Sequence, residues 1–174
     1  LIMPSYQRQP HLTLAVCGFW QSLPLLPPRG NDFFEVDLQR QLSQIAGFPR
    51  PSFELSVLGT NSFASAPFLE VIDPSHEHKL QRLRNCLSPQ DDDFRSIGYC
   101  PHITLGLFHR ALAILELYFL VSDPSDREPI PLSVLGLSLM SYDSRDLAGA
   151  LRLERRIEWD CNFHRENNCG KAAF

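Results

Sequence analysis

The chain has 174 residues, of which 44% are apolar and 21% charged, and this composition is ordinary for a soluble globular protein. The length suits one compact domain of two small lobes, and no apolar run approaches the roughly 18 residues that span a membrane. The formal net charge of −4 argues against a protein that holds long nucleic acid or duplex DNA, which needs a basic face. The five cysteines are odd in number and form no C-x-x-C pair, so we expect a reducing, cytoplasmic location without a disulfide framework.

The first predicted element is a strand that carries a histidine motif, PHLTL at residues 10–14. Because successive side chains of a strand point to opposite faces, His11 and Thr13 share one face and Leu12 and Leu14 the other. Proline is tolerated at the first residue of a strand, so Pro10 is expected to mark where this strand begins.

A helix is predicted after the first strand. Asp32 and Glu35, three residues apart, indicate a capping box, and Gly47 is expected to end the helix. The helix has an apolar stripe made of Leu38, Leu42, Ile45 and Ala46. Alternating residues then predict a strand over 53–57 and a hairpin partner over 67–72, joined by a loop over 59–66.

A second helix and a linker are predicted next. Asp73 is expected to cap the helix, Pro74 to lie in its first turn and Pro89 to stop it. Its stripe consists of Leu80, Leu83 and Leu87. The acidic, polar stretch 90–96 is expected to link two halves of the chain.

The second half repeats the order of the first. PHITL at residues 101–105 predicts a strand with His102 and Thr104 on one face, and the segment 109–120 favours a helix over a buried strand because it is rich in Ala, Leu and Glu. Strands are predicted over 132–142 and 150–159, with a turn over 143–149 between them.

The repeat predicts an α+β fold, bilobal, of two pseudo-symmetric β-α-β-β halves with antiparallel-rich sheets beside a central cleft and helices outside. A second echo supports it, since LSVLG occurs at residues 55–59 and again at 132–136. Within a single domain 1–174, the first lobe covers about 10–73, the connecting helix and linker 74–98, the second lobe 99–160 and a tail 161–174. A twofold relation between the halves would bring both histidine motifs into one cleft.

Two histidines and two threonines in one cleft suit acid–base chemistry on a phosphodiester. Imidazole titrates near pH ~6.5, so one neutral ring can take a proton while a protonated ring gives one. Hydroxyl groups beside them can donate to phosphoryl oxygens, where charge develops. This arrangement needs no metal and no cofactor.

The two motifs, HLTL and HITL, resemble the hallmark of the two-histidine phosphoesterase superfamily, which includes RNA 2′,3′-cyclic phosphodiesterases and 2′-5′ RNA ligase-like proteins. The resemblance covers about residues 10–159 and implies that His11, Thr13, His102 and Thr104 are catalytic. It further implies His102 as base toward water and His11 as acid toward the leaving ribose oxygen. Members usually have a strand before the first motif, so we expect that strand to be missing or another segment to take its place.

Several residues beside the motifs are candidates for substrate binding. Aromatic rings near strand ends can stack on a base, and basic side chains can contact phosphate. The candidates are Arg8, Trp20, Tyr99, Phe108 and Arg110. In the tail, Cys161, His164 and Cys169 fall short of the four ligands of a structural zinc site, so no metal site is predicted.

The sequence therefore predicts a monomeric, metal-independent phosphodiesterase that acts on 2′,3′-cyclic phosphate ends of RNA or on small cyclic nucleotides. Two alternatives use the same cleft: a phosphodiesterase for linear 2′-5′ oligonucleotides, and a module that binds a nucleotide or RNA end without turnover. The pattern leaves open the base preference, the product isomer and any role in ligation.

Overall fold

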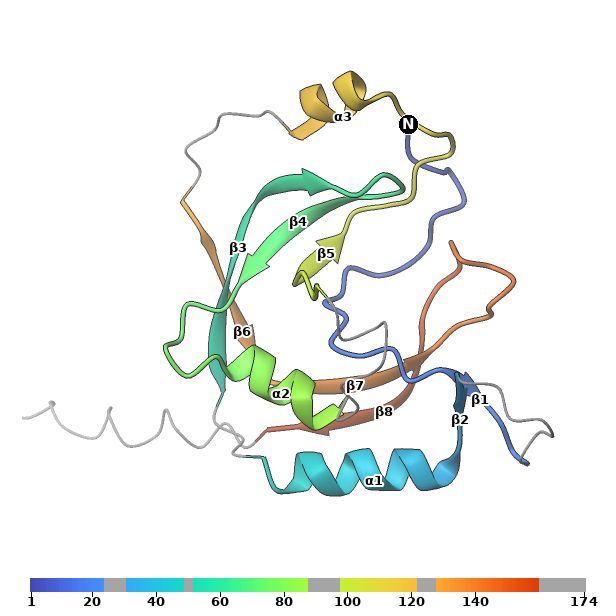
Figure 1. The fold of residues 1–174 in the computed structure, drawn as a ribbon, viewed down its shortest axis with the longest axis vertical. Helices are drawn as coiled ribbons and strands as arrows, with labels where there is room; N and C mark the ends of the chain where they lie inside the picture. Colours follow the sequence, from blue (N-terminus) through green and yellow to red (C-terminus); the bar gives the residue numbers. More distant parts are fainter. Residues whose placement is uncertain (24–30, 49–51, 88–97, 122–127, 160–174) are drawn as a thin grey trace, which may run out of the picture. The chain divides into compact units, whose positions relative to one another are not determined.

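The structure is a computed structural model that describes residues 1–23, 31–48, 52–87, 98–121 and 128–159 (Figure 1). The chain forms two compact units, each assembled from separated segments. We call the first the sheet unit; it comprises Leu1–Leu12, Arg50–Pro74 and His102–Phe174. The second, the helical unit, comprises Thr13–Pro49 and Ser75–Pro101. Each unit draws on both halves of the chain, whereas the predicted lobes are continuous, and those lobe boundaries stay a prediction.

The sheet unit contains a four-stranded antiparallel sheet in the order β5-β4-β3-β6, curled in Figure 1. Its strands are β3 (Phe53–Ser62), β4 (Pro67–Ile72), β5 (His102–Thr104) and β6 (Ile130–Val134). A second, two-stranded antiparallel sheet pairs β7 (Gly136–Ser141) with β8 (Arg152–Glu158). Helix α3 (Ile114–Val121) lies against β3.

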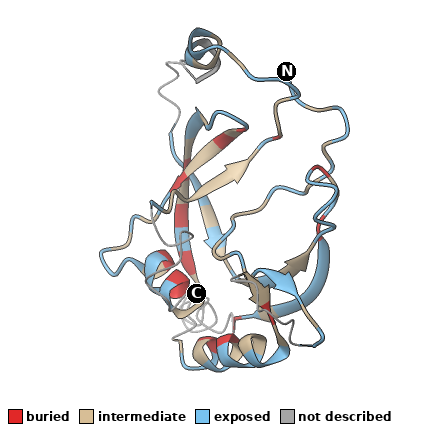
Figure 2. Ribbon diagram, turned by 45° about the vertical axis from the view of Figure 1, so that its right-hand side comes forward, coloured by how far each residue is buried: buried red, intermediate tan, exposed pale blue. Residues whose placement is uncertain are grey.

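Alternation along β3 and β4 builds the core of the sheet unit. Phe53, Leu55 and Val57 are buried on one face of β3, and Val71 of β4 pairs with Val57 on that face. The ring of Phe53 stacks on the ring of Trp159, with 5.6 Å between centroids. Figure 2 shows the buried residues along these long strands. The strand prediction for residues 53–57 is therefore confirmed.

The predicted hairpin is confirmed, but its loop is shorter than expected. β3 continues to Ser62 through a register shift between Val57 and Thr60, so only residues 63–66 connect it to β4. Phe63 and Ala66 close this turn with reciprocal backbone hydrogen bonds of 2.9 and 3.4 Å. Gly59, which reads as a loop residue in the sequence, lies inside the strand.

The two LSVLG segments begin next to each other in the same sheet, although only residues 132–134 of the second segment lie in it. Leu55 in β3 pairs with Leu132 in β6, and the two strands run antiparallel. The single strand predicted over 132–142 is wrong, because the chain leaves one sheet at Leu135 and enters the other at Gly136. A Cβ atom at Gly136 would lie 2.5 Å from the carbonyl oxygen of Ile157, so only glycine permits this close approach.

The helical unit packs helix α1 (Glu35–Ala46) against helix α2 (Lys79–Leu87). Ile45 of α1 and Leu80 and Leu83 of α2 are buried, which confirms the centre of each predicted stripe, whereas Ala46, predicted in the first stripe, is exposed. A short parallel pair, β1 (Phe19–Trp20) and β2 (Asp32–Phe33), precedes α1.

Both predicted helix starts are wrong. Asp32 belongs to β2, and the N-cap of α1 is Phe34, whose backbone N–H donates to the carboxylate of Asp37 at 3.1 Å. α2 begins at Lys79 rather than after Asp73, because His78 takes a left-handed backbone with φ 49° that interrupts any earlier helical turn. The hydroxyl of Ser75 accepts from the backbone N–H of Lys79 at 3.3 Å. The predicted stop at Pro89, the linker 90–96 and the tail lie outside the described residues.

The α+β class is confirmed, while the pseudo-symmetry of two equal halves is not shown by the described elements. β3 and β4 form a hairpin in one sheet, whereas β6 and β7 lie in different sheets. The first motif forms no strand; only Leu12 makes an isolated bridge. The helix predicted over 109–120 begins later, at Ile114, and the last predicted strand is confirmed as β8. Within the described ranges, no helix combines the length and the apolar character needed to cross a membrane.

Candidate functional site

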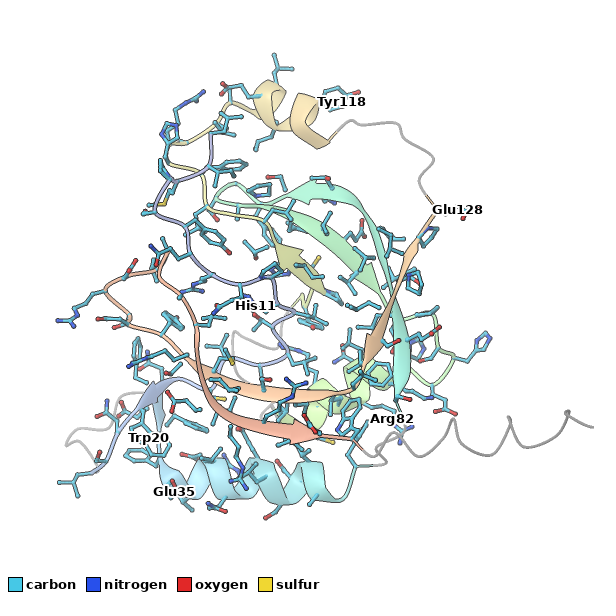
Figure 3. The ribbon with its side chains drawn as sticks, turned by 180° about the vertical axis from the view of Figure 1, so that it is seen from behind. His11, Trp20, Glu35, Arg82, Tyr118 and Glu128 are labelled. Atoms are coloured by element: carbon cyan, nitrogen blue, oxygen red, sulfur yellow. The ribbon has the colours of Figure 1, made fainter. Side chains whose placement is uncertain are left out.

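The two histidine motifs meet in the sheet unit at their central residues. Leu12 forms an antiparallel bridge with Ile103, and Figure 3 shows His11 beside β5. In an antiparallel pair, the residues that flank a bridge face each other with reversed order, so this register sets His11 opposite Thr104. In that register, His102 is the diagonal neighbour of His11. The bridge pairs the central residues of the two motifs, and the convergence of their four polar side chains in one cleft stays a prediction.

β4 supplies the neighbours of the second motif. Glu70 pairs with His102, and Phe68 pairs with Thr104. Directly paired residues of neighbouring strands share a face of the sheet, so all four side chains lie on one face. His102 is the first residue of β5, as the proline before it predicts.

The ring of His11 is oriented by the backbone two residues before it. Nδ1 lies 2.8 Å from the carbonyl oxygen of Gln9. A carbonyl only accepts, so Nδ1 carries a proton in this hydrogen bond and Nε2 is the nitrogen that remains for chemistry. Gln9 is held in turn by Leu151, since its side-chain amide donates to the Leu151 carbonyl at 3.2 Å and its oxygen accepts from the Leu151 N–H at 3.0 Å.

The ring of His102 is oriented by two aromatic side chains. Phe63 meets it edge to face, with 4.9 Å between centroids and 83° between planes. Phe68 lies at 5.2 Å and is buried, and the two phenyl rings contact each other at 4.3 Å. Such contacts restrict rotation of the imidazole without using its nitrogens.

Phe63, Glu70 and Gln9 are absent from the residues that the sequence singles out. Glu70 could have been noticed in the sequence, because it is a charged residue in the middle of an otherwise apolar strand. Phe63 and Gln9 carry none, because their role depends on the turn at 63–66 and on Leu151, which is 142 positions from Gln9.

Thr13 belongs to the helical unit, and its side chain is exposed. The hydroxyl of Tyr99 donates to the Thr13 carbonyl at 3.1 Å. The action of the Thr13 hydroxyl alongside the histidines stays a prediction.

A protein-family comparison matches residues 3–146 to the model described as 2′-5′ RNA ligase superfamily. The chain belongs to the 2′-5′ RNA ligase superfamily. The match covers most of the chain and includes both histidine motifs, so the resemblance drawn from HLTL and HITL is confirmed. No protein in a search of curated proteins matched the chain.

Two basic residues that the sequence suggests for substrate binding, Arg8 and Arg110, lie in the sheet unit and contact different partners. The guanidinium carbon of Arg8 is 4.2 Å from the centroid of the Tyr142 ring. Arg110 makes two hydrogen bonds to the carboxylate of Glu116, at 2.6 and 3.1 Å. This pair lowers the pKa of Glu116 to about 2, chiefly through the Arg110 hydrogen bonds.

The aromatic candidates also differ in their surroundings. Phe108 is held by its backbone, which donates to Ser65 and bridges to Ile2. Trp20, in the helical unit, is 53% exposed and meets Phe33 edge to face at 6.0 Å. Tyr99 has the guanidinium of Arg84 over its ring, so one face of that ring is covered. In the part of the chain that the structure describes, no group of three His, Cys, Asp or Glu side chains is arranged to hold a metal ion.

Proposed function

We propose that this member of the 2′-5′ RNA ligase superfamily is a phosphodiesterase that opens 2′,3′-cyclic phosphates at RNA ends or in small cyclic nucleotides. The observation that carries the proposal is the bridge between Leu12 and Ile103, which brings two histidine motifs together on one face. Diagonal neighbours across a strand pair lie up to roughly 7–8 Å apart, which leaves room for a phosphate between two imidazoles.

The reaction follows from the two rings. Neutral His102 takes a proton from a water molecule, and the water oxygen attacks phosphorus. The bond between phosphorus and one ribose oxygen breaks, and His11 gives its Nε2 proton to that oxygen. Afterwards His102 releases its proton to solvent and His11 takes one up from solvent, which restores both starting protonation states. The hydrogen bond from Nδ1 to the Gln9 carbonyl supports this role, because it leaves Nε2 of His11 directed away from its own backbone.

The threonines have a second part in the proposal. Their hydroxyls donate to the phosphoryl oxygens, on which negative charge grows as water attacks. Thr104 lies on the same face of β5 as His102, in the position from which such a hydrogen bond can form. Thr13 has the same place in its motif.

The test is hydrolysis of 2′,3′-cyclic AMP by three variants. A general acid or base contributes ~10²–10⁴-fold, so His11→Ala and His102→Ala should each lose most activity and keep the fold. His76→Ala is the matched control, because His76 is exposed and lies outside both motifs. Wild-type activity in either motif variant would contradict the mechanism, whereas a bell-shaped pH profile that persists in EDTA would support it.

Products from a panel of substrates separate the proposal from its alternatives. Cleavage of 2′-5′ oligoadenylate without opening of cyclic nucleotides would favour the linear phosphodiesterase. Saturable binding of a cyclic nucleotide without turnover would favour a binding module. The same panel, with 3′-5′ oligoadenylate included, also identifies which phosphate isomer is released.

A further inference from the structure

Two side chains of the helical unit donate hydrogen bonds to the backbone of the first motif. The guanidinium of Arg84, on α2, donates to the carbonyl oxygen of Leu14. The hydroxyl of Tyr99 donates to the carbonyl oxygen of Thr13 at 3.1 Å. The side chains of Arg84 and Tyr99 also contact each other, since the guanidinium carbon lies 4.2 Å from the centroid of the Tyr99 ring.

The sequence predicts a strand at the first motif, and the carbonyl groups of a strand normally accept hydrogen bonds from a neighbouring strand. In the described part of the chain, residues 13–18 form no strand. Successive carbonyls, those of Thr13 and Leu14, are bonded by side chains instead. The Thr13 carbonyl belongs to the peptide plane between Thr13 and Leu14, and the Leu14 carbonyl belongs to the next plane. The two bonds therefore restrain the backbone angles of Leu14 and fix the peptide plane on one side of the Thr13 Cα.

The burial of Arg84 is unusual for its residue type. Arg84 is only 6% exposed, whereas arginine is almost never fully buried unless it is paired. Its position on α2 lies beside buried Leu83, where an apolar side chain would pack without desolvating a charge. The bond to the Leu14 carbonyl and the Tyr99 ring offset part of that desolvation. Such burial also keeps Arg84 from acting as a contact residue for a bulky substrate.

Tyr99 is suited to a constant hydrogen bond. Burial raises the pKa of its hydroxyl to about 12, so the group keeps its proton throughout the physiological range. With one ring face covered by Arg84, the interpretation of Tyr99 as a base-stacking residue is weaker than its interpretation as a donor to the motif.

We infer that Arg84 and Tyr99 are positioning residues that clamp the backbone at Thr13 and Leu14 and so restrain the peptide next to the Thr13 side chain, whose hydroxyl is proposed to bind phosphate. This inference rests on the proposed function. In it, Arg84 and Tyr99 act only through Thr13.

A double-mutant cycle tests the clamp. Tyr99→Phe removes one hydroxyl and keeps the ring, and we expect kcat on 2′,3′-cyclic AMP to fall about 3- to 10-fold, the value of one net hydrogen bond. In a Thr13→Ala background the same change should have no further effect. Tyr118→Phe, on exposed α3, controls for the substitution itself. An equal fall in both backgrounds, or no fall in either, would overturn the inference, and so would full activity of Thr13→Ala.

Hydrogen–deuterium exchange tests the clamp without any turnover. Peptides that span residues 13–18 should exchange about 3- to 10-fold faster in Tyr99→Phe and in Arg84→Lys than in the wild type. Peptides from β3 and β4 should be unchanged in Tyr99→Phe. If the chain hydrolyses no cyclic nucleotide while exchange accelerates as expected, the proposed function fails and the clamp stands. If exchange at 13–18 is unaltered in Tyr99→Phe, the clamp is overturned, whatever the activity.

Discussion

Replacing Gln9 by alanine should both destabilise the sheet unit and misalign His11. The side chain of Gln9 makes two hydrogen bonds to the backbone of Leu151, a residue only 8% exposed. Each net hydrogen bond contributes about 0.5–1.5 kcal/mol, so Gln9→Ala should lower the free energy of unfolding by about 1–3 kcal/mol. For a chain of this size that corresponds to a fall of about 2–4 °C in Tm for each kcal/mol.

The effect on activity follows from the carbonyl of Gln9, which accepts the hydrogen bond from His11 Nδ1 at 2.8 Å. Without its tether to Leu151, this carbonyl no longer holds a fixed position, and kcat should fall while KM changes little. Thermal denaturation and hydrolysis of 2′,3′-cyclic AMP measure both effects in one preparation.

Two further variants make the test specific. Gln7→Ala is the matched control, because Gln7 is tied through its backbone N–H to the Ala148 carbonyl at 2.7 Å and the substitution leaves that bond intact. Gln9→Glu keeps the acceptor for the Leu151 N–H and loses the donor, so its Tm should lie between those of Gln9→Ala and the wild type. An unchanged Tm in Gln9→Ala, or an equal loss in Gln7→Ala, would refute the reasoning.

Two other predictions concern stability. Burial raises the pKa of Tyr99 from 10.0 to about 12, so the folded state favours the neutral phenol. The contribution of this group to the free energy of unfolding is fully present below about pH 10 and is lost as the pH rises through about 12. After discounting for the partly solvated ring this amounts to about 1–2 kcal/mol, and the phenolate absorbance of Tyr99→Phe should lack the latest titration step of the wild type. Gly136→Ala should cost about 1–3 kcal/mol in urea denaturation, because its Cβ would lie 2.5 Å from the Ile157 carbonyl oxygen. Gly59→Ala, with nothing within 4 Å of the added atom, should leave stability near the wild type, and equal losses in both would contradict the close-approach argument.

Local periodicity accounts for what the sequence predicts well. Phe53, Leu55 and Val57 alternate with exposed or half-buried residues, and the strand follows from that pattern alone. Leu80 and Leu83 lie one turn apart and are buried in α2. The pairing of the two motifs also follows from the sequence, because two equivalent H-x-T segments in one fold point to a common site.

The errors come from contacts between distant residues. The apolar pattern of 132–142 runs on without interruption, and only the approach of Ile157 to Gly136 reveals where the chain changes sheets. The first motif has the alternation of a strand, yet the carbonyls of Thr13 and Leu14 accept hydrogen bonds from the side chains of Tyr99 and Arg84. No local pattern records which partner a polar backbone group will find.

The four-stranded sheet ends differently at its two edges, and this difference bears on self-association. β6, the last strand at one edge, contains Pro131, which has no N–H to offer to a strand from another molecule. β5, at the other edge, has no proline within its three residues, and the bridge from Leu12 to Ile103 covers it instead. The segment that brings His11 to the site therefore also shields an open strand, so loosening it would expose a template for intermolecular pairing at the same time as it disabled the chemistry.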